Sequence, residues 1–99
     1  MLRLSEESKD LGTLKEGEIR AFAVKVYNDG SEPIKIEKLS VGCPGCTAAG
    51  LMGDPVLPTE PSILNVSFEG KSKGLNIKTV RLEYGEKKIL KLTFRAQVE

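Results

Sequence analysis

Residues 10–30 have the sequence DLGTLKEGEIRAFAVKVYNDG, and this stretch decides the fold. Within it, Phe22, Val24 and Val26 alternate with other side chains, which is the period of a strand with one buried face, and we predict a strand over residues 20–27. The Lys-Glu-Gly segment before this strand predicts a reversal, and Asn28-Asp29-Gly30 after it supplies residues that tolerate positive φ. An edge segment, a reversal and a core strand in this order are typical of a β-sandwich.

The middle of the chain is less regular. Pro33 predicts the start of a second strand, in which the apolar phase slips between Ile36 and Leu39. A bulge near Glu37-Lys38 would restore the register. Residues 42–61 are rich in glycine and proline, so we predict a long connection with room for one short strand and no long helix.

Regular alternation returns in the second half of the chain. Strands are predicted over residues 64–68 and 80–84, and Gly85-Glu86 predicts a hairpin turn into a long final strand over residues 90–98 that lies centrally in its sheet. Strands with one apolar face need a second sheet to cover that face. We therefore expect an all-β sandwich of about seven strands, formed as a single domain by residues 1–99.

Composition excludes several classes of partner. The 99 residues include 15 basic and 14 acidic side chains, a net charge of +1, so nothing draws the chain to nucleic acid. No apolar stretch approaches the roughly 18 residues of a membrane span, and residues 1–7 lack the apolar core of a signal peptide. We expect no membrane insertion, and a virus particle or the cytoplasm rather than the periplasm.

Several short motifs resemble a known family. In chain order, the motifs are Asp10-Leu11-Gly12-Thr13, Glu16-Gly17-Glu18, Val26-Tyr27-Asn28-Asp29-Gly30, Pro33-Ile34-Lys35-Ile36, Cys46-Thr47 and Val66-Ser67-Phe68. Together they resemble a bacterial family of uncharacterised immunoglobulin-like domains, which is similar in turn to the Hydin-type and major-sperm-protein-like domains of cilia and centrosomes.

The resemblance implies an immunoglobulin-like sandwich that acts as a scaffold or docking module. Such domains are often exported in bacteria, are found among virion-associated proteins of phages, and have no family catalytic residues. This chain departs from the family pattern in two places. Two residues rather than one separate Cys43 from Cys46, and Pro58-Thr59-Glu60-Pro61 stands where the family has a Pro-Gly turn. A role for the family's cysteines therefore does not carry over.

Histidine is absent from the sequence. This removes the usual general base, the usual partner of a Ser or Cys nucleophile and the commonest metal ligand. No pair of carboxylates has a spacing that would make the two converge. We therefore predict that the chain is not an enzyme, holds no cofactor or metal, and has no small-molecule substrate.

The pair Cys43 and Cys46 is the one motif with chemical potential, and three interpretations stay open. The pair could exchange disulfides, although a helix start that would lower a thiol pKa is not evident after Cys46. Two copies could share a zinc ion through four thiolates. The cysteines could instead be structural, either packed in a turn or joined in a local disulfide.

Leu51 and Met52 are large apolar residues in a segment where the pattern predicts no strand to bury them. They either cover the end of the sandwich or form a loop that contacts a partner. We expect a non-enzymatic structural or protein-docking module that binds a protein partner or assembles with itself. A repeated component of a larger assembly such as a phage virion is the favoured setting. The alternative is a small thiol protein that uses Cys43 and Cys46 for redox exchange or shared metal binding.

Overall fold

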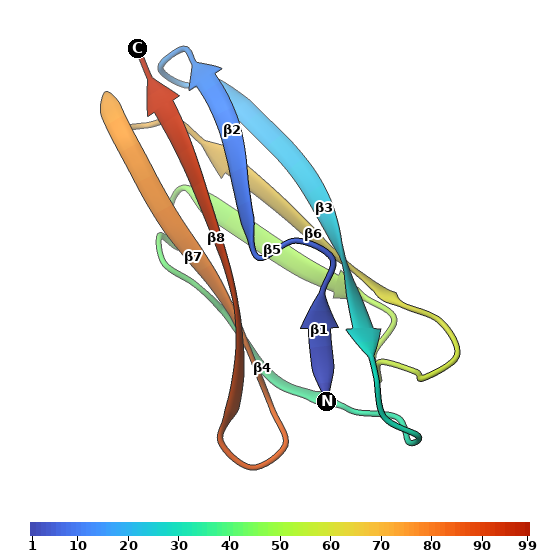
Figure 1. Cartoon of the computed structure of the whole chain (residues 1–99). Helices are drawn as coiled ribbons and strands as arrows, with labels where there is room; N and C mark the ends of the chain where they lie inside the picture. Colours follow the sequence, from blue (N-terminus) through green and yellow to red (C-terminus); the bar gives the residue numbers. More distant parts are fainter.

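The computed structural model describes residues 1–99 as two packed β-sheets of four strands each (Figure 1). The strand order is β1-β3-β6-β5 in the first sheet and β2-β8-β7-β4 in the second. The strands are Leu2–Leu4 (β1), Ser8–Leu14 (β2), Ile19–Asn28 (β3), Ile36–Val41 (β4), Thr47–Met52 (β5), Ser62–Glu69 (β6), Gly74–Tyr84 (β7) and Lys88–Val98 (β8). This confirms the all-β, immunoglobulin-like sandwich, with eight strands rather than about seven. There is no helix in the structure, and so none that could span a membrane.

The segment that decides the fold has the predicted organisation. Strand β2 lies at the edge of the second sheet, and β3 lies inside the first sheet between β1 and β6. The reversal between them carries the chain from one sheet to the other. Gly17 adopts a φ of 87° there, and the backbone N–H of Lys15 donates to the Glu18 carboxylate at 2.9 Å. A positive φ of this size favours glycine, which explains the residue at the reversal.

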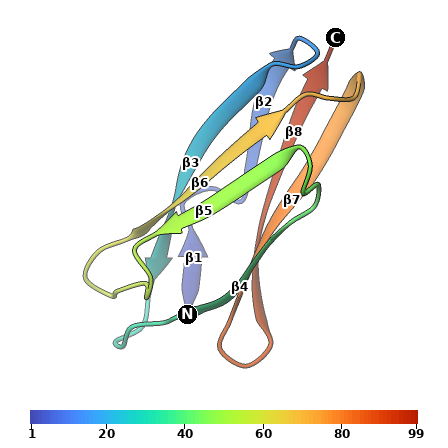
Figure 2. The same cartoon turned by 180° about the vertical axis from the view of Figure 1, so that it is seen from behind.

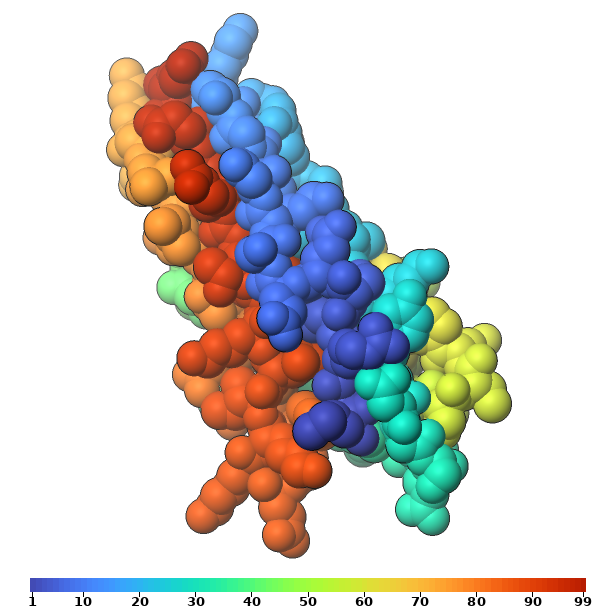
Figure 3. Space-filling view, in the orientation of Figure 1, coloured from blue at the N-terminus to red at the C-terminus, as the bar shows by residue number.

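One flank of the sandwich is closed by the N-terminal strands. Strand β1 pairs with β3, and the chain then crosses to the second sheet, where β2 pairs with β8 in parallel. Leu2, Leu4, Leu11 and Leu14 are all buried. In Figure 3 the blue atoms of β1 and β2 fill the surface between β3 and β8. The opposite flank, formed by β4 and β5, has no such strand across it (Figure 2).

The core is a single cluster of 17 buried apolar residues drawn from both sheets. Phe94 belongs to this cluster and is 1% exposed. Its ring meets the rings of Phe22 and Phe68 edge to face, with centroids 5.6 Å and 5.5 Å away. Because edge-to-face contact is a favoured arrangement of aromatic rings, the three phenylalanines stabilise the contact between the sheets.

The turn at Asn28-Asp29-Gly30 leads away from the first sheet, and the next strand starts later than predicted. Strand β4 begins at Ile36 rather than near Pro33, because Ile34 pairs only with Val56, in an isolated bridge. The predicted bulge is present, since the register of β4 against β7 shifts between Ile36 and Lys38.

The final strand is long and lies inside its sheet, as predicted. Strand β8 lies between β2 and β7, and Tyr84 pairs with Lys88 across the hairpin turn. Gly85 and Lys87 both take positive φ in this turn, at 59° and 62°. The side chains of Leu92, Phe94, Ala96 and Val98 all enter the core, as the alternation indicated.

Gly70, which follows β6, has less room for a side chain than any other glycine of the chain. A Cβ at Gly70 would lie 2.9 Å from Cγ2 and 3.3 Å from Cγ1 of Val98. Val98 is 1% exposed, so a shift of its side chain would press on its neighbours in the core. We expect Gly70→Ala to lower the free energy of unfolding by about 1–3 kcal/mol in urea denaturation, because overpacking forces side chains or backbone to shift. Gly45→Ala is the control, since a Cβ at Gly45 meets nothing within 4 Å, and equal effects of the two variants would contradict this account.

Candidate docking surface

Four strands lie at sheet edges, and three of them carry features that prevent pairing with another strand. Strand β1 has only three residues. Strand β2 carries Lys9 and Asp10 and has a register irregularity after Asp10. Strand β4 carries Glu37 and Lys38 at its bulge. Short length, charges and bulges are the devices by which proteins blunt the open edges of sheets.

Strand β5 has none of these devices. Its six residues, TAAGLM, include no charge and no proline, and its register against β6 is continuous from Thr47 to Met52. Strand β5 lies next to β6 alone, so one side of its backbone has no strand beside it. It is the unprotected edge of this molecule.

The backbone groups that face this edge follow from the register. The Glu69 N–H donates to the Cys46 carbonyl at 2.8 Å, so Cys46 and Glu69 occupy a hydrogen-bonded position of the ladder, while the Cys46 N–H donates to Cys43 instead. Hydrogen-bonded pairs alternate along an antiparallel ladder, which places the N–H and C=O groups of Ala48 and Gly50 toward β6. The same groups of Ala49 and Leu51 therefore face the open edge.

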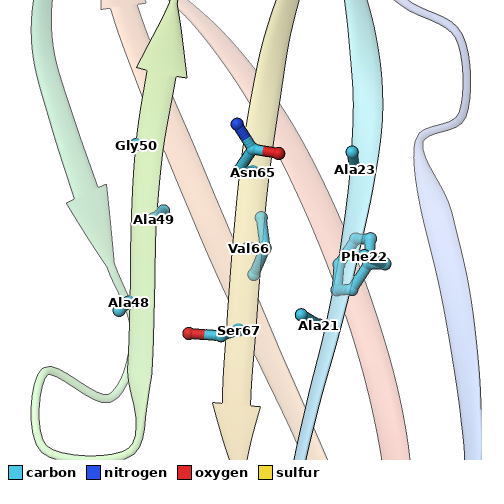
Figure 4. A pocket seen from close by; sticks show the side chains of 9 residues that line it. All are labelled: Ala21, Phe22, Ala23, Ala48, Ala49, Gly50, Asn65, Val66 and Ser67. Atoms are coloured by element: carbon cyan, nitrogen blue, oxygen red, sulfur yellow. The ribbon is translucent and has the colours of Figure 1, made fainter.

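The outer face of the sheet beside β5 is flat and consists of small side chains. Figure 4 shows Ala48 to Gly50 of β5 beside Asn65 to Ser67 of β6 and Ala21 to Ala23 of β3. Together these residues line a shallow groove of about 500 Å³. Cross-strand pairs place Ala21, Ser67 and Ala48 in one row, and Ala23, Asn65 and Gly50 in the next. The groove has no ionisable side chain.

Leu51 and Met52 lie in β5, and the sequence-based expectation of a loop was wrong. Successive side chains of a strand point to opposite faces, so the two residues do not form one contact. Leu51 is half-buried and packs against the core, whereas Met52 is 66% exposed beside the groove. The sequence left room for one short strand in residues 42–61 but did not locate it, because Ala48, Ala49 and Gly50 give no alternation of apolar and polar residues.

A line of half-buried apolar side chains lies between β4 and β5. Leu39 and Val41 contribute from β4, and Ala49 and Leu51 contribute from β5. We call these four residues the β4–β5 seam. They pack against the core on one side and are partly exposed on the other, because no strand covers this flank. The seam and the open edge of β5 are adjacent, since Ala49 and Leu51 belong to both.

The loop before β5 contains Cys43 and Cys46, which are joined in a disulfide with a Cα–Cα distance of 5.4 Å. The Cys43 carbonyl accepts hydrogen bonds from the N–H groups of Cys46 and Thr47, at 3.1 Å and 2.7 Å. Lys71 Nζ donates to the Gly45 carbonyl at 2.7 Å. The disulfide uses both cysteines of the chain, and Thr47 begins a strand rather than the helix that a thioredoxin-type site needs.

We predict that the disulfide stabilises the loop and has no part in docking. A loop this short removes little entropy from the unfolded chain, so replacing both Cys43 and Cys46 by serine should lower the free energy of unfolding by about 2 kcal/mol. Thermal unfolding with and without reductant measures this, because reductant should reproduce the loss in the natural sequence and leave the double variant unchanged. A loss of fold in the double variant would contradict the prediction.

The ionisable groups with shifted pKa values lie away from β5. Arg3 of β1, at the other edge of the same sheet, hydrogen-bonds to Asp29 at 3.0 Å and 3.2 Å and lowers the pKa of that carboxyl. The Lys15 N–H lowers the pKa of Glu18 at the reversal. Both carboxyls are exposed, so the stability they add is small; it is present above their unfolded-state pKa values and is lost as the pH falls through the folded ones.

Comparison with known proteins found a matching family and similar solved structures. The model of the family described as "Protein of unknown function (DUF1573)" matches residues 2–98. No curated protein matches the sequence. Among solved structures, a protein of unknown function from Porphyromonas gingivalis W83 is 16% identical with a TM-score of 0.83, over 97% of this chain and 46% of that one.

Two further solved structures have a similar fold. The ASH / PapD-like domain 7 of human CEP192 is 14% identical with a TM-score of 0.70, over 99% of this chain and 84% of that one. The secreted serine protease VesC from Vibrio cholerae is 13% identical with a TM-score of 0.66, over 90% of this chain but 21% of the protease. At these identities the likeness shows the fold. The chain spans less than half of the Porphyromonas and Vibrio proteins.

Proposed function

The chain belongs to the DUF1573 family, and we propose that it is a non-enzymatic protein-docking module whose contact surface is centred on β5. We define the β5 surface as the open edge of β5, the β4–β5 seam and the small-residue groove of the outer face. A foreign or identical protein is the proposed partner. We do not propose nucleic acid, membrane lipid or small molecules as partners.

One observation carries the proposal. Of the four edge strands, β5 alone combines six residues with an absence of charge, proline and bulge, and it borders a flat face without ionisable groups. Open edges of this kind pair readily with other chains, and proteins that do not use them protect them. Charges and bulges protect the other long edges of this sandwich, so β5 is the edge that is left open to pairing with another chain.

Two finer statements extend the proposal. We infer a relationship to Hydin-type and major-sperm-protein-like domains, which the likeness to the CEP192 domain supports at the level of the fold. A repeated component of a larger assembly, such as a phage virion, is a setting in which a docking module would act. The three neighbouring structures described above give that setting no support, and it stays a prediction.

Site-specific crosslinking in the native cell tests the proposal. A photoreactive amino acid in place of Ala48, which is exposed on β5, should give a discrete crosslinked product that contains a second protein. The matched control carries the same amino acid in place of Gln97, which is exposed on the outer face of the other sheet. Products that are absent from Ala48, or equal in kind and yield at both positions, would overturn the proposal.

A further inference from the structure

We propose that the β5 edge binds an extended segment of another protein as an added fifth strand, and that this segment carries apolar side chains at every second position. The inference rests on the proposed docking function and specifies its mode and the chemistry of the partner. Strand addition to an open edge obtains affinity from main-chain hydrogen bonds and specificity from alternate side chains.

The main-chain groups required for this mode are available. Ala49 and Leu51 each direct one N–H and one C=O to the open edge, as the register of β5 against β6 requires. The Thr47 carbonyl faces the same way, while the Thr47 N–H already donates to Cys43. An added strand would therefore find two donors and three acceptors along β5.

The side-chain pattern follows from the β4–β5 seam. Leu39 and Val41 of β4 and Ala49 and Leu51 of β5 pack against the core but are only partly buried. Every second side chain of an added strand would lie on the inner side of the sheet, where it would cover this seam. Apolar side chains fit these positions because they complete the burial, whereas a charge would be desolvated without a partner.

A foreign segment fits this edge better than a second copy of β5. Antiparallel pairing of β5 with its own copy about Ala49 would set Thr47 opposite Leu51 in both halves. The Thr47 N–H is already bonded to Cys43, so the Leu51 carbonyl of each copy would lack its donor. Pairing centred on Gly50 would set Ala49 opposite Leu51 in both halves, but it would place Thr47 opposite Gly53, where a φ of 93° ends the strand, so the Thr47 carbonyl of each copy would lack its donor. A foreign strand can place one N–H opposite the Leu51 carbonyl and another opposite the Thr47 carbonyl, and it need not offer an acceptor to the Thr47 N–H.

A peptide titration tests the inference. The probe is an end-capped peptide of about eight residues with valine at alternate positions and threonine or lysine between them, a length typical of strands. On addition to the full chain, the amide hydrogens of Ala49 and Leu51 should exchange with solvent at least about ten times more slowly, while those of Ala48 and Gly50 stay as they are. The same residues with the valines made consecutive should bind about ten times more weakly.

Two controls separate backbone pairing from other contacts. Methylating the peptide nitrogens that face β5 removes hydrogen bonds and keeps every side chain, so binding should weaken at least about ten-fold, whereas methylating the other nitrogens should change it less. Ala49→Pro removes a donor at the edge and no bond to β6, and should weaken binding similarly, while Ala48→Ser on the outer face should not.

The outcomes distinguish the inference from the proposed function. Slowed exchange at Ala49 and Leu51 that depends on alternation and on free peptide nitrogens supports strand addition. Binding that survives methylation on both sides overturns it. A crosslink at Ala48 without any such protection overturns strand addition while the docking function stands. Protection of Ala49 and Leu51 that rises with protein concentration, before peptide is added, would show that a second copy occupies the edge and would also overturn the inference.

Discussion

Phe94→Ala is expected to lower the free energy of unfolding by about 3–5 kcal/mol, the range for truncating a buried aromatic residue. The Phe94 side chain is 1% exposed and contacts Phe22 and Phe68, which come from the other sheet. Its removal leaves a cavity between the sheets and ends both ring contacts. A 99-residue sandwich has a total stability of about 5–15 kcal/mol, so the variant would lose much of it.

Urea denaturation followed by far-ultraviolet circular dichroism measures this loss. Ile77→Ala is the matched control, because Ile77 lies on the neighbouring strand β7 but is 58% exposed. Its effect should stay within about 0.5 kcal/mol, as for surface substitutions. Similar effects of the two substitutions would mean that the two sheets do not pack around Phe94 as described.

Asn28→Asp is expected to lower the free energy of unfolding by about 3 kcal/mol. The buried Asn28 amide donates through Nδ2 to the carbonyls of Glu32 and Val56, at 2.7 Å and 2.9 Å, and accepts through Oδ1 from the Gly30 N–H at 2.8 Å. An aspartate has the same shape and still accepts from Gly30. At neutral pH it has no donor, so a buried carboxylate oxygen would face two carbonyl oxygens.

The same denaturation experiment measures this effect, with Asp29→Asn as the control. Asp29 is the next residue and undergoes the reverse substitution, but its ion pair with Arg3 is on the surface. Exposed ion pairs contribute about 0–1 kcal/mol, so the control should change stability by no more than that. An Asn28→Asp variant as stable as the control would contradict the donor role assigned to the Asn28 amide.

Much of the fold could be predicted because alternation marks half-buried strands directly. Phe22, Val24 and Val26 identified β3, and Phe94, Ala96 and Val98 identified β8. The phase slip between Ile36 and Leu39 located the bulge of β4, since a one-residue shift moves every later side chain to the other face. These are patterns of local sequence, and local sequence is sufficient to recognise them.

Other features depend on contacts that local patterns do not carry. The chain crosses from β1 in one sheet to β2 in the other. Strand β2 then pairs in parallel with β8, which brings the N-terminal and C-terminal parts of the chain side by side. One short strand was allowed for between residues 42 and 61, but the position of β5 was not predicted because Ala48 to Gly50 are small and do not alternate in polarity. Its pairing with β6, rather than its own propensity, makes it a strand.

Only part of the candidate site could be predicted from the sequence. Leu51 and Met52 were predicted to cover the end of the sandwich or to contact a partner from a loop, and both belong to the strand that we propose as the contact. Which strands form the edges depends on strand order, and strand order does not follow from the sequence of any one strand. The sequence also left three interpretations of Cys43 and Cys46 open, because spacing alone does not determine the state of the sulfurs.

Amide hydrogen exchange of the chain alone, followed residue by residue by nuclear magnetic resonance, tests the central claim most directly. If β5 is an open edge, Ala48 and Gly50, whose N–H groups bond to β6, should exchange slowly, while Ala49 and Leu51 should exchange at the rate of exposed amides. This alternation should be independent of protein concentration. Equal protection of all four amides would mean that the edge is already covered, and would contradict the account of β5 as the docking strand.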